Sequence, residues 1–239
     1  MSGTVHGVGL GPGAADLMSV RADRLVRGAR HVAYFRKGGR QGQARRIVEG
    51  MLRADAVEFP MEYPVTTEIP LEDPRYAVAL AGFYAKCAAH LRGLAEGGAD
   101  VVVLCEGDPF FYGSFMHLFT RLKDDVPVQV VPAITGMSAA WTATGAPITW
   151  GDDVLTVAPA TLSEAELTRR IAETDALVVM KIGQNLPKLK RAIAAAGRME
   201  AAWLVEYAAM PEQRVMPLAE AETAPYFSIA ILHGEGRRP

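Results

Sequence analysis

The residues best suited to chemistry stand in one short turn, residues 105–113, with the sequence CEGDPFFYG. Glu106 and Asp108 supply two carboxylates, and the glycines beside them allow the backbone to turn tightly. A carboxylate pair could serve as general acid and base, or it could bind the polar groups of a ligand. Asp108 followed by Pro109 also suits the start of a helix, with the aspartate as the cap. Because the spacing of the two acids in a turn does not fix their separation, these alternatives stay open.

The segment before this turn predicts how it is positioned. Residues 101–104 are VVVL, a run of aliphatic residues typical of a strand buried on both faces of a parallel sheet. Ligands of such sheets bind just beyond the carboxyl ends of the strands. The turn is therefore expected at the ligand-binding edge of a sheet.

Two further loops rich in glycine and proline follow predicted strands. Residues 9–14, GLGPGA, loosely match the dinucleotide-binding fingerprint, in which backbone amides hold a pyrophosphate. Pro12 has no amide to donate, and the next strand runs into Arg36 where a ribose-binding acid is expected. A nicotinamide or flavin cofactor is therefore disfavoured, and a plain tight turn is an alternative. The glycines nevertheless indicate a backbone that a ligand approaches closely. Residues 132–136, PAITG, form the second loop.

The densest group of positive charges follows the predicted second strand. It comprises Arg36, Lys37, Arg40, Arg45 and Arg46, with no acid among residues 36–46. Charge runs of this kind are usually solvated helix ends. The alternative is a site for carboxylates or phosphates, which the planar guanidinium group binds through two oxygens at once.

The order of elements predicts an α/β fold on a parallel sheet, because strands and helices alternate from the start of the chain. Strands are predicted at 5–10, 31–35, 57–59, 101–105, 126–131, 154–157, 176–180 and 203–205, near 215, and at 227–232. Helices are predicted at 19–28, 44–53, 74–97, 111–123, from 136 onward, 163–173 and 185–196. Four prolines, at 60, 64, 70 and 74, predict a long irregular loop after the third strand.

The length of 239 residues accommodates two modest α/β lobes, each with its own core. The strand-helix rhythm restarts after the strand at 126–131. We therefore predict an N-terminal α/β lobe over residues 1–125 and a C-terminal α/β lobe over residues 126–239.

Composition argues against several classes of function. A formal net charge of -2 does not suit nonspecific binding to nucleic acid, which neutralises many phosphates. The only cysteines, Cys87 and Cys105, lack a paired spacing and are predicted to be reduced thiols of a cytoplasmic protein. The sequence shows no signal peptide, and no apolar run approaches the roughly 18 residues of a membrane span. The five histidines are scattered, which predicts no metal site.

Taken together, the motifs resemble the tetrapyrrole methyltransferases of corrin and sirohaem synthesis. The resemblance rests on residues 8–13 with 17–22, residues 106–113, and residues 131–136, in this order, and it covers nearly the whole chain. Within the family, residues 63–70 and 110–115 are most similar to members that methylate carbon C-20 of a cobalamin precursor.

The resemblance implies two α/β lobes with S-adenosylmethionine in the cleft between them, in a homodimer. Carried over position by position, it places cofactor contacts at Pro12, Glu106, Gly107, Asp108, Phe111, Thr135, Gly136, Met180, Lys181 and Ala208. The chain departs from relatives at Ala14 and Ala15, where many have Asp-Pro or Asp-Ala, and at Ala208, where some have glycine.

The implied substrate is a tetrapyrrole polycarboxylate, which gives the basic group a role. Substrate contacts are expected at Arg36, Lys37, Arg40, Arg45, Arg46, Tyr63, Thr66 and Thr67. No single residue is identified as the general base: Tyr34, Tyr63, Glu68, Tyr112, water and a carboxylate of the substrate stay open as alternatives. The same reaction on a cobalt-containing substrate, another ring position, and a noncatalytic protein that binds S-adenosylmethionine or a tetrapyrrole remain as alternatives.

Overall fold

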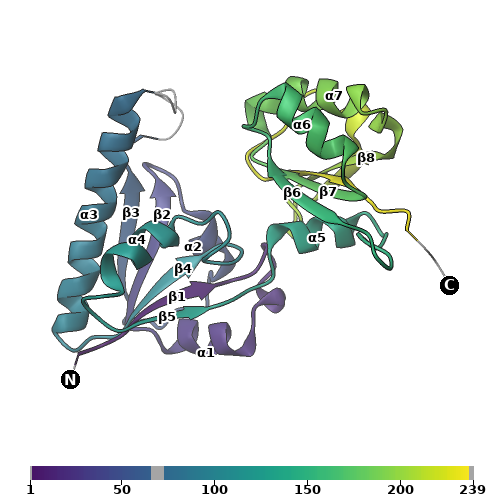
Figure 1. The fold of residues 1–239 in the computed structure, drawn as a ribbon. Coiled ribbons are helices and arrows are strands. Elements are labelled where there is room, and N and C mark those ends of the chain that lie inside the picture. Colours follow the sequence, from purple (N-terminus) through teal and green to yellow (C-terminus); the bar gives the residue numbers. More distant parts are fainter. Residues whose placement is uncertain (1, 66–72, 237–239) are drawn as a thin grey trace. The chain divides into compact units, whose positions relative to one another are not determined.

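The computed structural model describes residues 2–65 and 73–236. The chain divides into two compact units, Met1–Thr135 and Gly136–Pro239, each with its own sheet (Figure 1). Each unit is an α/β structure, as the sequence predicts. No helix of the described residues has the length and apolar character needed to cross a membrane.

The first unit is built on a five-stranded parallel sheet in the order β3-β2-β4-β1-β5. Its strands are β1 (Val5–Gly9), β2 (His31–Lys37), β3 (Val57–Tyr63), β4 (Val101–Cys105) and β5 (Val128–Val131). Its helices are α1 (Val20–Gly28), α2 (Gln43–Ile47), α3 (Pro74–Glu96) and α4 (Phe115–Leu122). β1 and β4 lie in the interior of the sheet and are buried along their whole length, which explains their apolar sequences.

Helices cover both faces of this sheet (Figure 1). α3 and α4 pack with Val101 and Val103 on one face, and α1 and α2 pack with Val102 and Leu104 on the other. Two helices begin at side-chain caps, because Ser19 accepts the Ala22 N–H at 3.1 Å and Asp73 accepts the Arg75 N–H at 2.9 Å.

α4 begins at Phe115, whereas the sequence predicted a helix from residue 111. The residues before it form an irregular turn, and Tyr112 has a φ of 54°, which lies outside the helical region. Asp108 accepts the Phe110 N–H at 2.8 Å, so this aspartate closes a turn and does not cap a helix.

The prediction that Pro60 lies in an irregular loop was wrong, because β3 continues through it to Tyr63. Pro60 pairs with Tyr34 of β2, and β3 is the edge strand of the sheet. A proline lacks the backbone N–H that a second neighbouring strand would require, but an edge strand has no second neighbour.

The second unit is built on a mixed sheet in the order β6-β7-β10-β8-β9, and among its described neighbouring pairs only β6–β7 is parallel. Its strands are β6 (Leu155–Pro159), β7 (Ala176–Met180), β8 (Ala202–Glu206), β9 (Arg214–Pro217) and β10 (Ser228–Leu232). Its helices are α5 (Gly136–Ala143), α6 (Glu164–Ala172) and α7 (Leu186–Ala195). α6 and α7 share a core with one face of the sheet, and α5 packs on the other.

The division between the units falls after Thr135, later than the boundary at residue 126 expected from the sequence. β5 belongs to the first sheet, where Val128 pairs with Val5 of β1. The rhythm of elements does not reveal this pairing, because β5 and β1 stand at opposite ends of the first unit's sequence.

Candidate functional site

Three loops meet at Gly9, at the carboxyl edge of the first sheet. A Cβ atom placed on Gly9 would lie 2.6 Å from the Ala133 Cβ, 2.9 Å from the Gly107 carbonyl oxygen and 2.9 Å from the Pro109 Cδ. The loops after β1, β4 and β5 therefore touch at a point that only glycine can occupy. This edge is where an open parallel sheet binds its ligands.

Backbone hydrogen bonds hold the first two of these loops together. The Leu10 N–H donates to the Cys105 carbonyl at 2.9 Å, and the Gly107 N–H donates to the Gly11 carbonyl at 2.8 Å. Gly11 and Gly107 have φ values of 82° and 65°, and this conformation would be strained for a residue that carries a side chain. The glycines in these loops thus allow the strand pairing to continue past the ends of the strands.

The Asp108 carboxylate joins the turn after β4 to the loop after β5. Its Oδ1 accepts the Phe110 N–H at 2.8 Å, and its Oδ2 accepts the Ala133 N–H at 3.0 Å. Among the alternatives that the sequence left open for this turn, the structure therefore gives Asp108 a positioning function.

The Glu106 carboxylate is in a different environment. Its Oε2 atom is buried and has no hydrogen-bond partner among the described residues. Burial raises the pKa of Glu106 to about 7. At this edge of the sheet the chain therefore presents a carboxyl group that exchanges a proton near neutral pH.

The other predicted cofactor residues of the first unit flank the same loops. Pro12 is buried in the loop after β1. Phe111 lies in the β4 turn with its ring centroid 4.8 Å from that of Tyr112, and Thr135 is the last residue of the unit. The structure therefore brings Glu106, Gly107 and Asp108 together with the loops that hold Pro12 and Thr135.

The remaining predicted cofactor residues lie in the second unit. Gly136 begins α5, Met180 ends β7, and Lys181 follows with a φ of 57°. Ala208 follows β8 between Tyr207 and Ala209, with φ values of 51° and 59°.

β7 and β8 both run antiparallel to β10, so their carboxyl ends lie at one edge of the second sheet. Residues other than glycine rarely adopt positive φ, and such strain concentrates at functional sites. Each of the two strands ends in residues of this kind, which marks this edge as a second place for ligand contacts.

The predicted basic group is only partly available for an anion. Arg36 pairs with Glu62 and donates from Nε at 2.8 Å, and Arg45 pairs with Glu58 through two hydrogen bonds of 2.8 and 3.0 Å. Both acids come from β3, which lies beside β2 in the sheet. Sequence reasoning counted no acid near these cations because the partners are distant along the chain.

The other three cations differ from one another. Arg46 donates to Gln43 at 3.3 Å. Lys37 ends β2 and is exposed. Arg40 is exposed and forms no side-chain hydrogen bond or ion pair with the described part of the chain. Arg40 is thus better placed than Arg36 or Arg45 to bind a new carboxylate.

Tyr63 belongs to a cluster of hydroxyl groups that the sequence did not predict. Its Oη lies 2.5 Å from the Ser114 Oγ, and the Tyr84 hydroxyl donates to the same oxygen at 3.2 Å. Ser114 follows directly on the glycine that ends the β4 turn, which is the one signal that could have identified it. Thr66, Thr67 and Glu68 lie outside the described residues.

Comparison with known proteins assigns this arrangement to a family. A profile of the tetrapyrrole (corrin/porphyrin) methylases matches residues 4–223, which is most of the chain. The chain belongs to the tetrapyrrole methylase family. Its motifs and its two α/β units are those expected of this family from the sequence.

Several members of the tetrapyrrole methylase family align over almost the whole chain. A precorrin-2 C(20)-methyltransferase from Sinorhizobium sp. is 47% identical over 239 residues, which cover 99% of this chain and 98% of that protein. The cobalamin biosynthesis protein CobIJ of Mycobacterium tuberculosis is 43% identical over 238 residues, although the match covers only 47% of that longer protein. A cobalt-precorrin-2 C(20)-methyltransferase from Salmonella typhimurium is 25% identical over 98% of this chain and 97% of that protein.

Solved structures of the family share the fold at low sequence identity. A cobalt precorrin-4 methyltransferase superposes with a TM-score of 0.73 at 20% identity, over 96% of this chain and 94% of that chain. A uroporphyrin-III C-methyltransferase from Thermus thermophilus, solved with S-adenosylhomocysteine, superposes with a TM-score of 0.65 at 22% identity, over 98% of both chains.

Membership of the tetrapyrrole methylase family makes this chain an S-adenosylmethionine-dependent methyltransferase. The loop residues fit such a cofactor on structural grounds. The loops after β1, β4 and β5 pack closely at Gly9, and the buried Glu106 Oε2 has among the described residues no hydrogen-bond partner of the kind that a ligand would supply.

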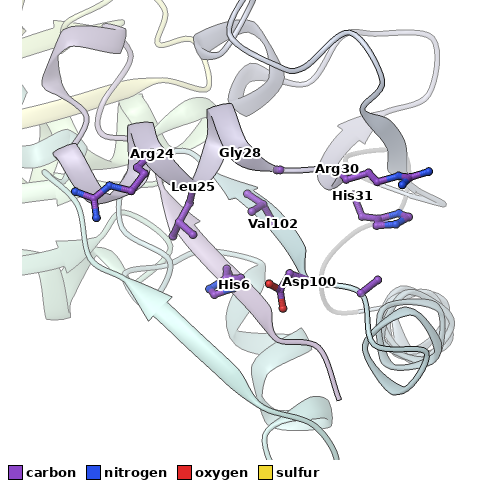
Figure 2. A pocket seen from close by; sticks show the side chains of 10 residues that line it. His6, Arg24, Leu25, Gly28, Arg30, His31, Asp100 and Val102 are labelled. Carbon is purple, nitrogen blue, oxygen red and sulfur yellow. The ribbon is translucent and has the colours of Figure 1, made fainter. Parts of the chain in front are cut away.

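A hollow of about 500 Å³ lies elsewhere in this tetrapyrrole methylase chain, at the amino ends of β1 and β2 (Figure 2). His6 and Asp100 face it, and burial lowers the pKa of His6. None of the predicted cofactor or substrate residues lines this hollow. Its position opposite the carboxyl edge separates it from the candidate site.

Proposed function

We propose that this chain transfers a methyl group from S-adenosylmethionine to C-20 of precorrin-2, giving precorrin-3A in cobalamin biosynthesis. The observation that carries the proposal is the 47% identity to a precorrin-2 C(20)-methyltransferase across 98% of that protein. The relative named for the cobalt-containing substrate is 25% identical over a similar span, which favours the metal-free substrate.

The cofactor supplies an already activated methyl group, so the chain's own task is to bind, orient and exclude water. Well-oriented reactants can recover about 7 to 11 kcal/mol of an activation barrier. The proposed cofactor contacts are Pro12, Glu106, Gly107, Asp108, Phe111, Thr135, Gly136, Met180, Lys181 and Ala208. The packed loops around Gly9 and the two hydrogen bonds of Asp108 support a rigid arrangement of the contacts in the first unit.

Of the proposed substrate contacts, Arg36, Lys37 and Tyr63 lie at the carboxyl ends of β2 and β3. Arg40 and Lys37 would bind substrate carboxylates directly, while Arg36 and Arg45 serve mainly in their ion pairs with β3. Arg46, Tyr63, Thr66 and Thr67 complete the proposed set. Arginine suits this task because its fork matches the two oxygens of a carboxylate.

We further place the enzyme in the cytoplasm as a homodimer. The two buried cysteines support a reducing compartment, since both are free thiols. The dimer follows from the family resemblance, and the oligomeric state can be measured by light scattering on the purified protein.

The deciding experiment incubates the purified protein with precorrin-2 and S-adenosylmethionine carrying a ¹³C-labelled methyl group. The expected product gains one methyl group by mass, and NMR places the label at C-20. A label at another carbon would show that the chain carries out a different methylation reaction of the family. Stoichiometric binding of both ligands without product would instead show a noncatalytic binding protein. A parallel reaction with cobalt-precorrin-2 compares the two substrates.

A further inference from the structure

Glu106 is held in place by backbone bonds on both sides. The residue before it, Cys105, accepts the Leu10 N–H at 2.9 Å, and the residue after it, Gly107, donates to the Gly11 carbonyl at 2.8 Å. The pairing of β1 with β4 thus continues across this position. The backbone that carries the Glu106 side chain is therefore fixed by the sheet.

The described residues around Glu106 supply no counter-charge, because burial alone shifts its pKa. Its Oε2 is buried without a hydrogen-bond partner among the described residues. The loops at 9–13 and 132–135 carry no titratable side chain. An unpaired buried carboxylate is costly, so its persistence in the sheet edge calls for a ligand that compensates it.

The titratable groups nearest to Glu106 along the chain do not supply this counter-charge. Cys105 is a buried thiol whose pKa is raised by desolvation and then by the charges of Glu106 and Asp108. Asp108 is itself an acid, and both of its oxygens accept backbone N–H groups. On the neighbouring strand β2, Arg36 is paired with Glu62. Tyr112 follows in the same turn and carries no positive charge.

We infer that the Glu106 carboxylate is the counter-ion of the sulfonium group of bound S-adenosylmethionine and accepts the proton that the reaction releases. The inference rests on the proposed function and deepens it. A sulfonium is a permanent cation, whereas the thioether of S-adenosylhomocysteine is neutral. A buried carboxylate beside the sulfur is therefore ionised with the first ligand and protonated with the second.

This assignment balances the charges of the reaction. The bond between sulfur and the methyl carbon breaks, a carbon–carbon bond forms at C-20, and a proton must leave that carbon. As the positive charge on sulfur disappears, the Glu106 carboxylate loses its partner and takes up this proton as an O–H bond. The ligand-free pKa of about 7 means that only modest changes in its surroundings switch the group between its two forms.

The test measures proton exchange on binding, which does not depend on turnover. Isothermal titration calorimetry with each ligand is performed at pH 7 in two buffers of different ionisation enthalpy. The proteins compared are the wild type, Glu106→Gln and a control, Glu200→Gln, which removes an exposed acid of the second unit. Any proton exchanged by the ligands themselves is common to all three proteins and cancels in the comparison.

We expect the wild type and the control to release about half a proton with S-adenosylmethionine and to take up about half a proton with S-adenosylhomocysteine, relative to Glu106→Gln. Equal proton exchange in the wild type and Glu106→Gln would overturn the inference while leaving the proposed function intact. Failure of all three proteins to bind either ligand would overturn the proposed function and the inference together.

A second measurement on the wild type covers the case in which Glu106→Gln does not fold. The affinity for S-adenosylmethionine relative to S-adenosylhomocysteine is expected to rise about thirtyfold from pH 6 to pH 7.5, because the first ligand favours the ionised carboxylate and the second the protonated one. A ratio that stays constant over this range would equally refute the assignment.

Discussion

The Asp108 Oδ2 atom accepts the backbone N–H of Ala133 at 3.0 Å, across 25 residues of sequence. This bond joins the turn after β4 to the loop after β5, two segments that do not follow one another in the sheet. β1 lies between those strands, and its Gly9 contacts both loops. A single carboxylate thus holds in register the loops that the proposed cofactor contacts occupy.

Replacement of Asp108 by Ala is expected to lower stability and cofactor affinity together. Two charge-assisted hydrogen bonds are lost and two backbone N–H groups lose their acceptor, which corresponds to about 2 to 3 kcal/mol. Chemical denaturation gives the stability, and calorimetry with S-adenosylhomocysteine gives the affinity. Asp124→Ala, which removes an exposed partner of Lys123, is the control and should change stability by less than about 0.5 kcal/mol.

Replacement of Gly9 by Ala is expected to push the three loops apart. The new Cβ would lie 2.6 Å from the Ala133 Cβ and 2.9 Å from the Gly107 carbonyl oxygen, both closer than such atoms approach. A loss of about 2 kcal/mol in stability is expected from this overpacking. The double variant Gly9→Ala with Ala133→Gly should regain part of this loss in thermal denaturation, because the shortest of the three contacts is relieved. If the stability changes of the single variants Gly9→Ala and Ala133→Gly simply add in the double variant, the contact between these two residues is contradicted.

Replacement of Arg40 by Ala is expected to raise the Michaelis constant for precorrin-2 about three- to tenfold, the range for one lost charge-assisted contact. Arg45→Ala should act less on the Michaelis constant and instead weaken the attachment of α2 to β3, because Arg45 of α2 is paired with Glu58 of β3. Arg27→Ala, at an exposed ion pair on α1, serves as the control. If both Arg40→Ala and Arg45→Ala leave the Michaelis constant unchanged, the basic group does not bind substrate.

The stability of the ligand-free protein should fall as the pH rises from about 4.5 to about 7. Burial raises the pKa of Glu106 from 4.5 to about 7, so the folded state binds this proton more tightly than the unfolded state. The resulting stabilisation, on the order of 3 kcal/mol, is fully present below the unfolded pKa and is lost as the pH passes through the folded pKa. Denaturation at several pH values compares the wild type with Glu106→Gln, in which this contribution is absent. Parallel curves for the two proteins would disprove the burial of an ionisable carboxyl.

Neither cysteine of the folded protein should react with thiol reagents at pH 8. Desolvation raises the pKa of Cys87 to about 11 and that of Cys105 further, so almost no thiolate forms. A colorimetric disulfide reagent should therefore detect two thiols only after denaturation. Rapid labelling of either cysteine in the native protein would show that its environment is more open than the structure indicates.

The sequence by itself determined the elements and the places where chemistry is possible. Aliphatic runs such as residues 101–104 identify buried strands, and helical spacing identifies α3, because these signals arise from neighbours along the chain. The glycine-rich turns after β1 and β4 likewise mark the ligand edge. The family could be inferred from these motifs, since their order and residue types are visible without a fold.

Tertiary structure alone decided which of these residues act together. The partners of Arg36 and Arg45 on β3, the bond from Ala133 to Asp108, and the assignment of β5 to the first sheet all depend on pairing between distant segments. Pro60 is tolerated in β3 only because that strand lies at the edge. Local sequence does not encode such partners, because hydrogen bonds and ion pairs form according to distance in space. For the same reason, only the tertiary structure shows that the Glu106 Oε2 has no hydrogen-bond partner among the described residues.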